Sequence, residues 1–319
     1  MPADVYEEQL RGLPKKERKA LQREFSRMQR EDQRKRKKRN KIIRRTSMIV
    51  VAVAVVAIAT LVTVNNIRAG LIGPANMASD GIVFSGSPSQ SADQSSSSQN
   101  TITAATSAAL QVGQTPTPTV FDPSTGGLSV VLYVDYANAD AASFETTNAS
   151  NVQGWVNQGY ATLEIHPVAL NSTDGNDPST RAANAIACVA NTEPDAVLAV
   201  HNALIADQAT IASAGLSNDD LVALVSKAGV TDAAVSKCIT SNDFDNWVSD
   251  ATKRAKASLP NSDVPALTKV PLVLVDGSSY TGSLTDATAF ETFVSDTYTK
   301  NTPASTASPT PTPDPTSGG

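Results

Sequence analysis

The chain has 319 residues, enough for two domains of ordinary size, but only 18% are charged and 5% aromatic, which excludes one uniform, densely packed globule. Residues 1–47 hold 17 Lys and Arg against 7 Asp and Glu, whereas the remaining 272 residues hold 9 against 24. A basic head therefore precedes an acidic body, and this division excludes a nucleic-acid binder that uses the whole chain.

An uncharged apolar run follows the basic head. Residues 48–64 read MIVVAVAVVAIATLVTV, and at 1.5 Å per residue such a helix spans roughly 26 Å of a ~30 Å hydrocarbon core. Apolar residues on both sides can extend it, so we predict a transmembrane anchor over residues 48–67. A buried core helix is the alternative, but the run has no polar face.

The flanks of this run predict its orientation. Residues 34–45 (RKRKKRNKIIRR) carry nine Lys and Arg and no acid, so the positive-inside rule places the N-terminus in the cytoplasm and the rest of the chain outside. A cleaved signal peptide is the rival hypothesis, but it needs a short basic region and a small-residue cleavage site. We predict a single-pass membrane protein whose basic segment 1–47 contacts anionic lipid.

Two stretches have the composition of unfolded chain. Residues 68–127 include SGSPSQSADQSSSSQN and TPTPT, and we predict a disordered linker that reaches roughly 45 Å root-mean-square. The tail 301–319 contains SPTPTPDPT and is predicted to be disordered as well.

Residues 128–300 have the periodicity of an α/β domain. Three segments are predicted strands because they are short and either apolar or alternating: 128–134, 160–166 and 270–276. Four apolar stripes predict helices around residues 195–208, 217–229, 244–251 and 290–294. Residues 217–220 (SNDD) form a capping box, and Gly229 suits the end of that helix. The order of elements predicts an α/β fold with a helical insertion.

Cys188 and Cys238 are the only cysteines, and both lie on predicted helices. An even pair outside the membrane favours a structural disulfide, which would close a loop of about 51 residues and stabilise the fold by roughly 4 kcal/mol. Two free buried thiols and a redox-active pair are the alternatives. Efficient exchange cysteines usually lie close together at a helix N-terminus, which disfavours the last of these.

The segment VVLYVDYANADAASFE resembles the active-site region of the DsbA-like branch of the thioredoxin-fold family, in its membrane-tethered actinobacterial form. The resemblance continues through GYATLEIHPVAL, STRAANAIACVA, LAVHNALIA and KVPLVLVDG. It implies a thioredoxin-like fold and a protein disulfide oxidoreductase activity. It also implies a helical-domain disulfide at Cys188 and Cys238, a cis peptide bond before Pro271, and peptide binding by Val270, Pro271 and Tyr136.

The chain departs from the family where the family carries its chemistry. Asn138 and Ala141 occupy the two positions at which the resemblance requires the cysteines of Cys-Pro-x-Cys. Disulfide exchange needs a thiolate, which neither an amide nor a methyl group supplies. The helix N-terminus there would still offer free N–H groups to an anion. No catalytic residue is expected at this site.

Other chemistry has little support in the sequence. His166 and His201 are the only histidines, and neither has the spacing of a metal site, so we predict no metal and no cofactor. His201 lies on an apolar helical face and is predicted to be a core histidine with a satisfied hydrogen bond. Nucleic acid is not expected as a partner, because the outer part of the chain is acidic.

Three functional hypotheses follow. The first is an extracytoplasmic, membrane-anchored thioredoxin-like domain that has lost redox catalysis and acts as a binding or chaperone-like module on exported polypeptides. The second is a thiol–disulfide oxidoreductase that uses Cys188 and Cys238 as its exchangeable pair. The third is a surface stalk with a folded knob and no small-molecule role.

Overall fold

The computed structural model of the chain describes residues 72–87, 101–122, 127–170, 172, 177–213 and 215–301. The predicted basic segment 1–47, the predicted anchor 48–67 and all but the first residue of the predicted tail lie outside these ranges. Within them, no helix is both long enough and apolar enough to cross a bilayer.

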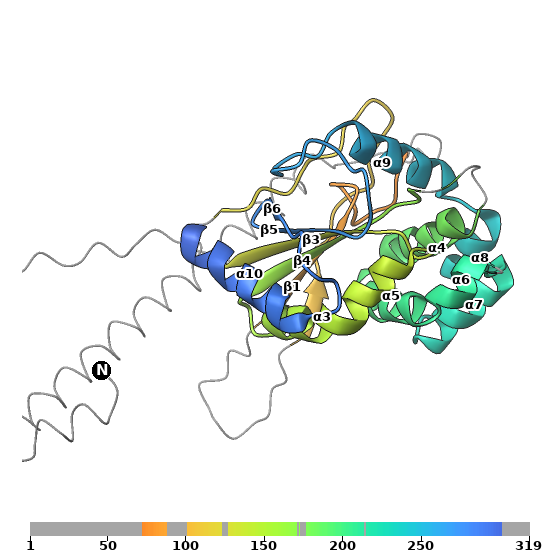
Figure 1. The fold of residues 1–319 in the computed structure, drawn as a ribbon. Helices are drawn as coiled ribbons and strands as arrows, with labels where there is room; N and C mark the ends of the chain where they lie inside the picture. The colour runs from red at the N-terminus through yellow and green to blue at the C-terminus, as the bar shows by residue number, and fades with distance from the viewer. Residues whose placement is uncertain are drawn as a thin grey trace, which may run out of the picture. The chain divides into compact units, whose positions relative to one another are not determined.

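The described elements begin with three strands, continue with a helix, a strand and a run of helices, and end with two strands and a helix (Figure 1). The strands are β1 (Ile82–Ser87), β2 (Thr101–Ala104), β3 (Leu128–Val134), β4 (Ala161–Pro167), β5 (Leu272–Val275) and β6 (Ser278–Ser279). The helices are α3 (Ala139–Asn157), α4 (Pro178–Thr192), the 3-10 turn η2 (Pro194–Ala196), α5 (Val197–Ala206), α6 (Gln208–Ser213), α7 (Asn218–Lys227), α8 (Ala233–Ser241), α9 (Asp245–Ala257) and α10 (Ala287–Asn301). The predicted α/β fold with a helical insertion is therefore confirmed.

The strands form one mixed sheet in the order β2-β1-β4-β3-β5-β6. β3 and β4 pair in parallel, with Val130 opposite Leu163, and α3 makes the crossover between them. The other pairs are antiparallel. β3 reads as a continuous apolar run because both of its faces are covered, as is usual for a central parallel strand.

Helices cover both faces of the sheet. The larger core packs one face against α3 and α10, where the rings of Phe144 and Phe290 meet edge to face at 5.1 Å between centroids. A smaller core lies on the other face and joins Tyr133 and Leu272 of the sheet to Ala255 of α9. Figure 1 shows α3 and α10 on one side of the strands and α9 on the other.

The helical insertion runs from α4 to α9, and α4 is its central element. Eleven residues of α4 are buried, because α5, α6, α7, α8 and α9 all contact it. The predicted capping box is present at the start of α7, where Ser217 and Asp220 bond each other's backbone, and the chain leaves the helix at Gly229 with φ of 103°.

The prediction of an unfolded linker over residues 68–127 is wrong for residues 72–87 and 101–122. β1 pairs with β4, and β2 pairs with β1, so both strands extend the sheet that the sequence placed after residue 127. These strands are only six and four residues long, and IVFSGS and TITA carry too little periodicity to stand out beside the Ser-rich stretch between them. The edge of β4, distant in sequence, supplies their pairing partner.

Residues 72–81, which we call the entry segment, are held across the helical insertion. The backbone N–H of Ala75 donates to Oδ1 of Asn191 on α4, and Nδ2 of Asn76 donates to the carbonyl of Ala190. Further along, Arg254 of α9 binds both carboxylate oxygens of Asp80, at 2.6 and 2.7 Å. The entry segment is therefore part of the folded body.

Candidate site at the start of helix α3

The candidate site is the turn that joins β3 to α3. Asn138 is the N-cap of α3, with extended backbone angles of −91° and 123°, and its Oδ1 accepts a hydrogen bond from the backbone N–H of Ala141 at 3.0 Å. Asn is among the preferred N-cap residues because its short side chain satisfies one of the unpaired N–H groups of the first turn. The amide of Asn138 thus serves the helix.

This arrangement decides what the turn can do chemically. A side chain at position 138 faces the helix N-terminus, where a thiolate would be stabilised by the free N–H groups and the dipole. Here the N–H of Ala141 is already bonded to an uncharged carbonyl oxygen, and the Ala141 side chain is fully buried. An amide and a buried methyl group contain no nucleophile that attacks a disulfide.

The buried carboxylate of Asp135 fixes the turn through two hydrogen bonds. Its Oδ1 accepts from the N–H of Ala137 at 3.0 Å, and its Oδ2 accepts from the N–H of Leu170 after β4 at 3.0 Å. The carbonyl of Ala137 in turn accepts from Nε2 of Gln208 on α6 at 2.9 Å. The turn is therefore fixed both to the loop after β4 and to the helical insertion.

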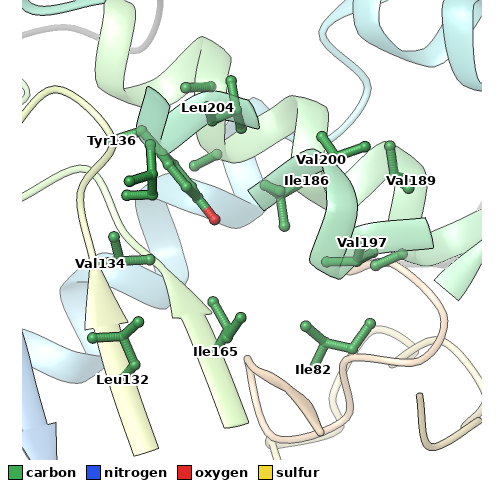
Figure 2. Close-up of a cluster of buried hydrophobic side chains, with 14 of the residues drawn as sticks. Ile82, Leu132, Val134, Tyr136, Ile165, Ile186, Val189, Val197, Val200 and Leu204 are labelled. Carbon is green, nitrogen blue, oxygen red and sulfur yellow. The ribbon is translucent and has the colours of Figure 1, made fainter. Parts of the chain in front are cut away.

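Tyr136 points inward, which corrects the expectation that it contacts a bound peptide. Its exposed fraction is 0%, and Figure 2 shows its ring between Val134 of β3 and Leu204 of α5. The hydroxyl lies 2.9 Å from Nδ1 of His201, and Nε2 of His201 lies 3.3 Å from Oε2 of Glu145 on α3. A ligand on the surface cannot reach this side chain.

The hydrogen-bonded series Tyr136–His201–Glu145 joins the turn after β3, the insertion and α3 through buried polar groups. Burial, and secondly the Glu145 carboxylate, raises the pKa of Tyr136 well above its ordinary value, so the phenol keeps its proton. Both ring nitrogens of His201 have a partner, which confirms the prediction of a core histidine with satisfied hydrogen bonds. The segment that carries the resemblance ends on Glu145, but sequence reasoning assigned this residue no role, and it did not single out Gln208.

Pro271 lies at the same edge of the sheet as the start of α3. The peptide bond between Val270 and Pro271 is cis, as the resemblance implies. Tyr133 pairs with Leu272, so one step further along this antiparallel register Pro271 lies opposite Val134, the last residue of β3.

Val270 and Pro271 lie directly before β5, beyond the part of the strand that pairs with β6. The side chain of Val270 is buried in the smaller core, and Pro271 is buried as well. β6 pairs only with Leu274 and Val275, so among the described residues no strand pairs with the outer side of β5 at its Pro271 end. An edge of this kind can accept an added strand.

Cys188 and Cys238 form the predicted disulfide, which joins α4 to α8 with a Cα–Cα distance of 5.7 Å. Cys188 has an exposed fraction of 0% and Cys238 of 8%. The chain contains no other cysteine, and this pair is separated by 50 positions, so no Cys-x-x-Cys is present.

A second buried polar cluster lies on the opposite face of the sheet. Oε1 of Glu164 accepts from the hydroxyl of Ser79 at 2.5 Å and lies 3.0 Å from Nε2 of His166, whose ring stacks on Tyr133. Burial alone would raise the pKa of Glu164, but His166 and the hydroxyl donors lower it below its ordinary value. The alternation in β4 indicated a half-polar strand, yet its polar face is covered by the entry segment.

The residues described here include no group of three or more His, Cys, Asp or Glu that could hold a metal ion. Sequence comparison with curated proteins finds no match. A family model described as Thioredoxin matches residues 126–295, which is 170 of the 319 residues.

The solved structures that resemble this fold include disulfide oxidoreductases. Oxidised DsbA of Mycobacterium tuberculosis is 23% identical and aligns with a TM-score of 0.45 over 55% of this chain and 88% of that chain. The reduced disulfide bond oxidoreductase DsbG of the same organism is 22% identical and aligns with a TM-score of 0.46 over 57% of this chain and 86% of that chain. The thiol-disulfide oxidoreductase MdbA of Actinomyces oris is 22% identical and aligns with a TM-score of 0.44 over 54% of this chain and 81% of that chain.

Proposed function

Because the chain belongs to the thioredoxin family, we propose that it is a membrane-anchored, extracytoplasmic member of the DsbA-like branch that has lost disulfide exchange and binds extended polypeptides. The observation that carries the proposal is the cap at the start of α3. There the side chain of Asn138 accepts from the N–H of Ala141, at the position where the resemblance places the reactive thiol.

Loss of catalysis at this turn leaves its framework in place. β3, the turn, α3 and the cis bond before Pro271 are all present, and Asp135 and Gln208 still hold the turn through hydrogen bonds. A framework without its nucleophile is suited to binding a partner. We therefore assign Asn138 and Ala141 to the degenerate cysteine positions and expect no catalytic residue there.

The proposed ligand is an extended segment of an exported polypeptide that pairs with the backbone at Val270 and Pro271. Main-chain hydrogen bonds supply affinity in strand addition without requiring one particular sequence, which suits a chaperone-like module. The outer side of β5 offers such groups beyond the reach of β6. Lys269 precedes this edge and is exposed, so it lies where a bound peptide would pass.

The proposed location rests on the sequence. Residues 48–67 carry no charge, and nine Lys and Arg precede them within residues 34–45, so the folded domain lies outside the cytoplasmic membrane. The partners are then the lipid bilayer, through the anchor, and exported polypeptides.

The competing hypothesis is a thiol–disulfide oxidoreductase that uses Cys188 and Cys238. Exchange requires a thiolate to reach one of the sulfur atoms and form a mixed disulfide. Both residues are buried, and α4 is surrounded by other helices of the insertion, which counts against this access. A glutathione titration read by alkylation and mass spectrometry tests it, because facile reversible opening of the bond would support the oxidoreductase.

The binding proposal is tested by site-specific photo-cross-linking on the full chain in detergent or nanodiscs. A photoreactive side chain replaces Lys269, and a matched probe replaces Lys237, which is also exposed and lies on α8 of the insertion. We expect a cysteine-free unfolded polypeptide to cross-link at position 269 and not at 237, in the wild type and in the Cys188→Ser variant alike. Equal yields at the two positions, or binding lost with Cys188→Ser while the fold persists, would contradict the proposal.

A further inference from the structure

The folded body begins almost immediately after the predicted anchor. The anchor ends at Ile67, and Ile72 is already hydrogen-bonded within the fold, since its N–H donates to the carbonyl of Leu110 at 2.9 Å. Five residues span at most about 18 Å even when fully extended. The linker of 60 residues expected from composition would instead allow roughly 45 Å.

The entry segment cannot detach to lengthen the connection between the anchor and the folded body, because contacts along its length fix it to the insertion. Gly73 packs against the indole of Trp247 so closely that an added Cβ would lie 2.8 Å from the ring. Ala75, Asn76 and Asp80 are bonded to α4 and α9, and Asp80 is held by two hydrogen bonds from one guanidinium group. Detaching this segment would break a paired charge and expose a buried tryptophan.

Two large apolar side chains lie exposed where the chain enters the fold. Ile72 has an exposed fraction of 39%, and Val112 has one of 71%. Val112 lies in the turn that follows Leu110, the residue that Ile72 bonds, and Gly113 at its tip has a positive φ of 86°. We call Ile72 together with the exposed residues 111–115 the entry face.

The entry face carries no charge although the outer half of the chain is strongly acidic. Residues 69–79 and 94–121 contain no Asp, Glu, Lys or Arg, and both ranges contribute the chain around Ile72 and Val112. The residues of the entry face can approach lipid headgroups without burying a charge of their own, whereas the acidic remainder would be repelled by anionic lipid. The uncharged composition and the short connection to the anchor therefore both indicate that this side of the folded body is the one nearest the membrane.

We infer that the entry face lies against the outer leaflet of the bilayer, so that the domain is held at the membrane surface and not at a distance from it. This inference rests on the proposed anchor and adds which face of the folded body lies against the membrane. The polypeptides that the protein binds would then be those present within a domain's width of the membrane, such as chains that have just crossed it.

The test compares two exposed side chains on the full chain reconstituted in phosphatidylglycerol and phosphatidylethanolamine vesicles. Val112→Cys and Tyr160→Cys each receive the same fluorophore, and Tyr160, 62% exposed, serves as the matched control. Leu110, two residues before Val112, bonds Ile72, whereas Tyr160 bonds Leu128 at the start of β3, so the control residue lies outside the entry face. Neither substitution touches the core.

We expect lipid-borne bromine or nitroxide to quench the label at position 112 several-fold more than the label at position 160. Alkaline extraction of the same vesicles separates the two ideas. If the chain remains in the membrane and both labels are quenched equally, the anchor stands and the inference about the entry face is overturned. If alkali releases the chain, the proposed anchor fails and the inference falls with it.

Discussion

The start of α3 and the contact between α4 and α8 each have one of the two features that disulfide exchange needs, an activating helix N-terminus or cysteine sulfur, and each lacks the other. The turn at Asn138 has a helix N-terminus that would stabilise a thiolate, but it has no sulfur. The α4–α8 contact has both cysteine sulfur atoms of the chain, but it holds them within a packed insertion. The comparison teaches that cysteine chemistry depends on placement, because in this protein the two cysteines lie away from the helix N-terminus that would activate a thiol.

The largest effect should come from restoring the missing sulfur atoms. We expect the double variant Asn138→Cys with Ala141→Cys to gain insulin-reductase activity that the wild type lacks, because position 138 faces the N–H groups of the first turn of α3. Turbidity of reduced insulin measures the activity, and alkylation with mass spectrometry identifies the reactive pair.

The matched control is Asn138→Ser with Ala141→Ser, which has nearly the same shape and no sulfur. Activity in the cysteine variant no higher than in the serine variant, with both new thiols open to alkylation, would show that the turn lacks the geometry assigned to it.

The next effect concerns the disulfide itself. Replacing Cys188 and Cys238 together by Ala should lower the free energy of unfolding by about 4 kcal/mol, because the bond closes a loop across 50 positions. Urea unfolding of the full chain in detergent measures this, and polypeptide binding should persist while the fold persists. A loss of binding in the still-folded variant would make the disulfide part of the function.

A smaller effect is expected at the cap of α3. Asn138→Ala removes the acceptor of the Ala141 N–H and should lower the free energy of unfolding by about 1 kcal/mol. Asn138→Asp retains an acceptor and adds a negative charge at the positive end of the helix, so it should be at least as stable as the wild type. Equal losses in both variants, measured in urea, would show that the cap contributes nothing.

The smallest effect is a pH dependence of the free energy of unfolding, which comes from a carboxylate in the helical insertion. Burial raises the pKa of Asp245, at the start of α9, to about 6, with Arg181 lowering it and Asp177 raising it. Between about pH 4 and pH 6 the folded chain holds a proton that the unfolded chain has released, so stability falls as the pH rises through this window.

Asp245→Asn should remove this dependence. The side chain is only half-buried, so we expect a difference of about 1 kcal/mol or less between pH 4 and pH 6. The measurement is the free energy of unfolding of both proteins at the two pH values. A parallel slope in the two proteins would assign the proton to another group.

Much of the fold could be predicted where local pattern and burial agree. β3 occupies the predicted residues 128–134, and the predicted strands at 160–166 and 270–276 correspond to β4 and β5 with shifts of one or two residues. The final helix extends to Asn301, one residue past the predicted end of the domain. Strand periodicity and capping are local properties, so they are readable from the residues themselves.

The candidate site was only partly predictable for the opposite reason. Tyr136 follows the strand in the expected place, yet its ring is buried because His201, 65 positions away, accommodates its hydroxyl. The same holds for Glu164, whose partner Ser79 belongs to a stretch that composition classed as unfolded. Hydrogen-bond partners distant in sequence leave no periodic signal.

The sequence by itself predicted three of the strands and most of the helices of residues 128–300 and favoured a disulfide between its only two cysteines. It also determined that the turn before α3 has no sulfur. Each of these depends on residue type or short-range pattern. Only the tertiary structure decided that residues 72–87 and 101–122 belong to the folded body, that Tyr136 points inward, and that Ile72 bonds Leu110, close in sequence to the exposed Val112. Those outcomes depend on the edge of β4 and on buried polar partners, which exist only once distant segments have packed together.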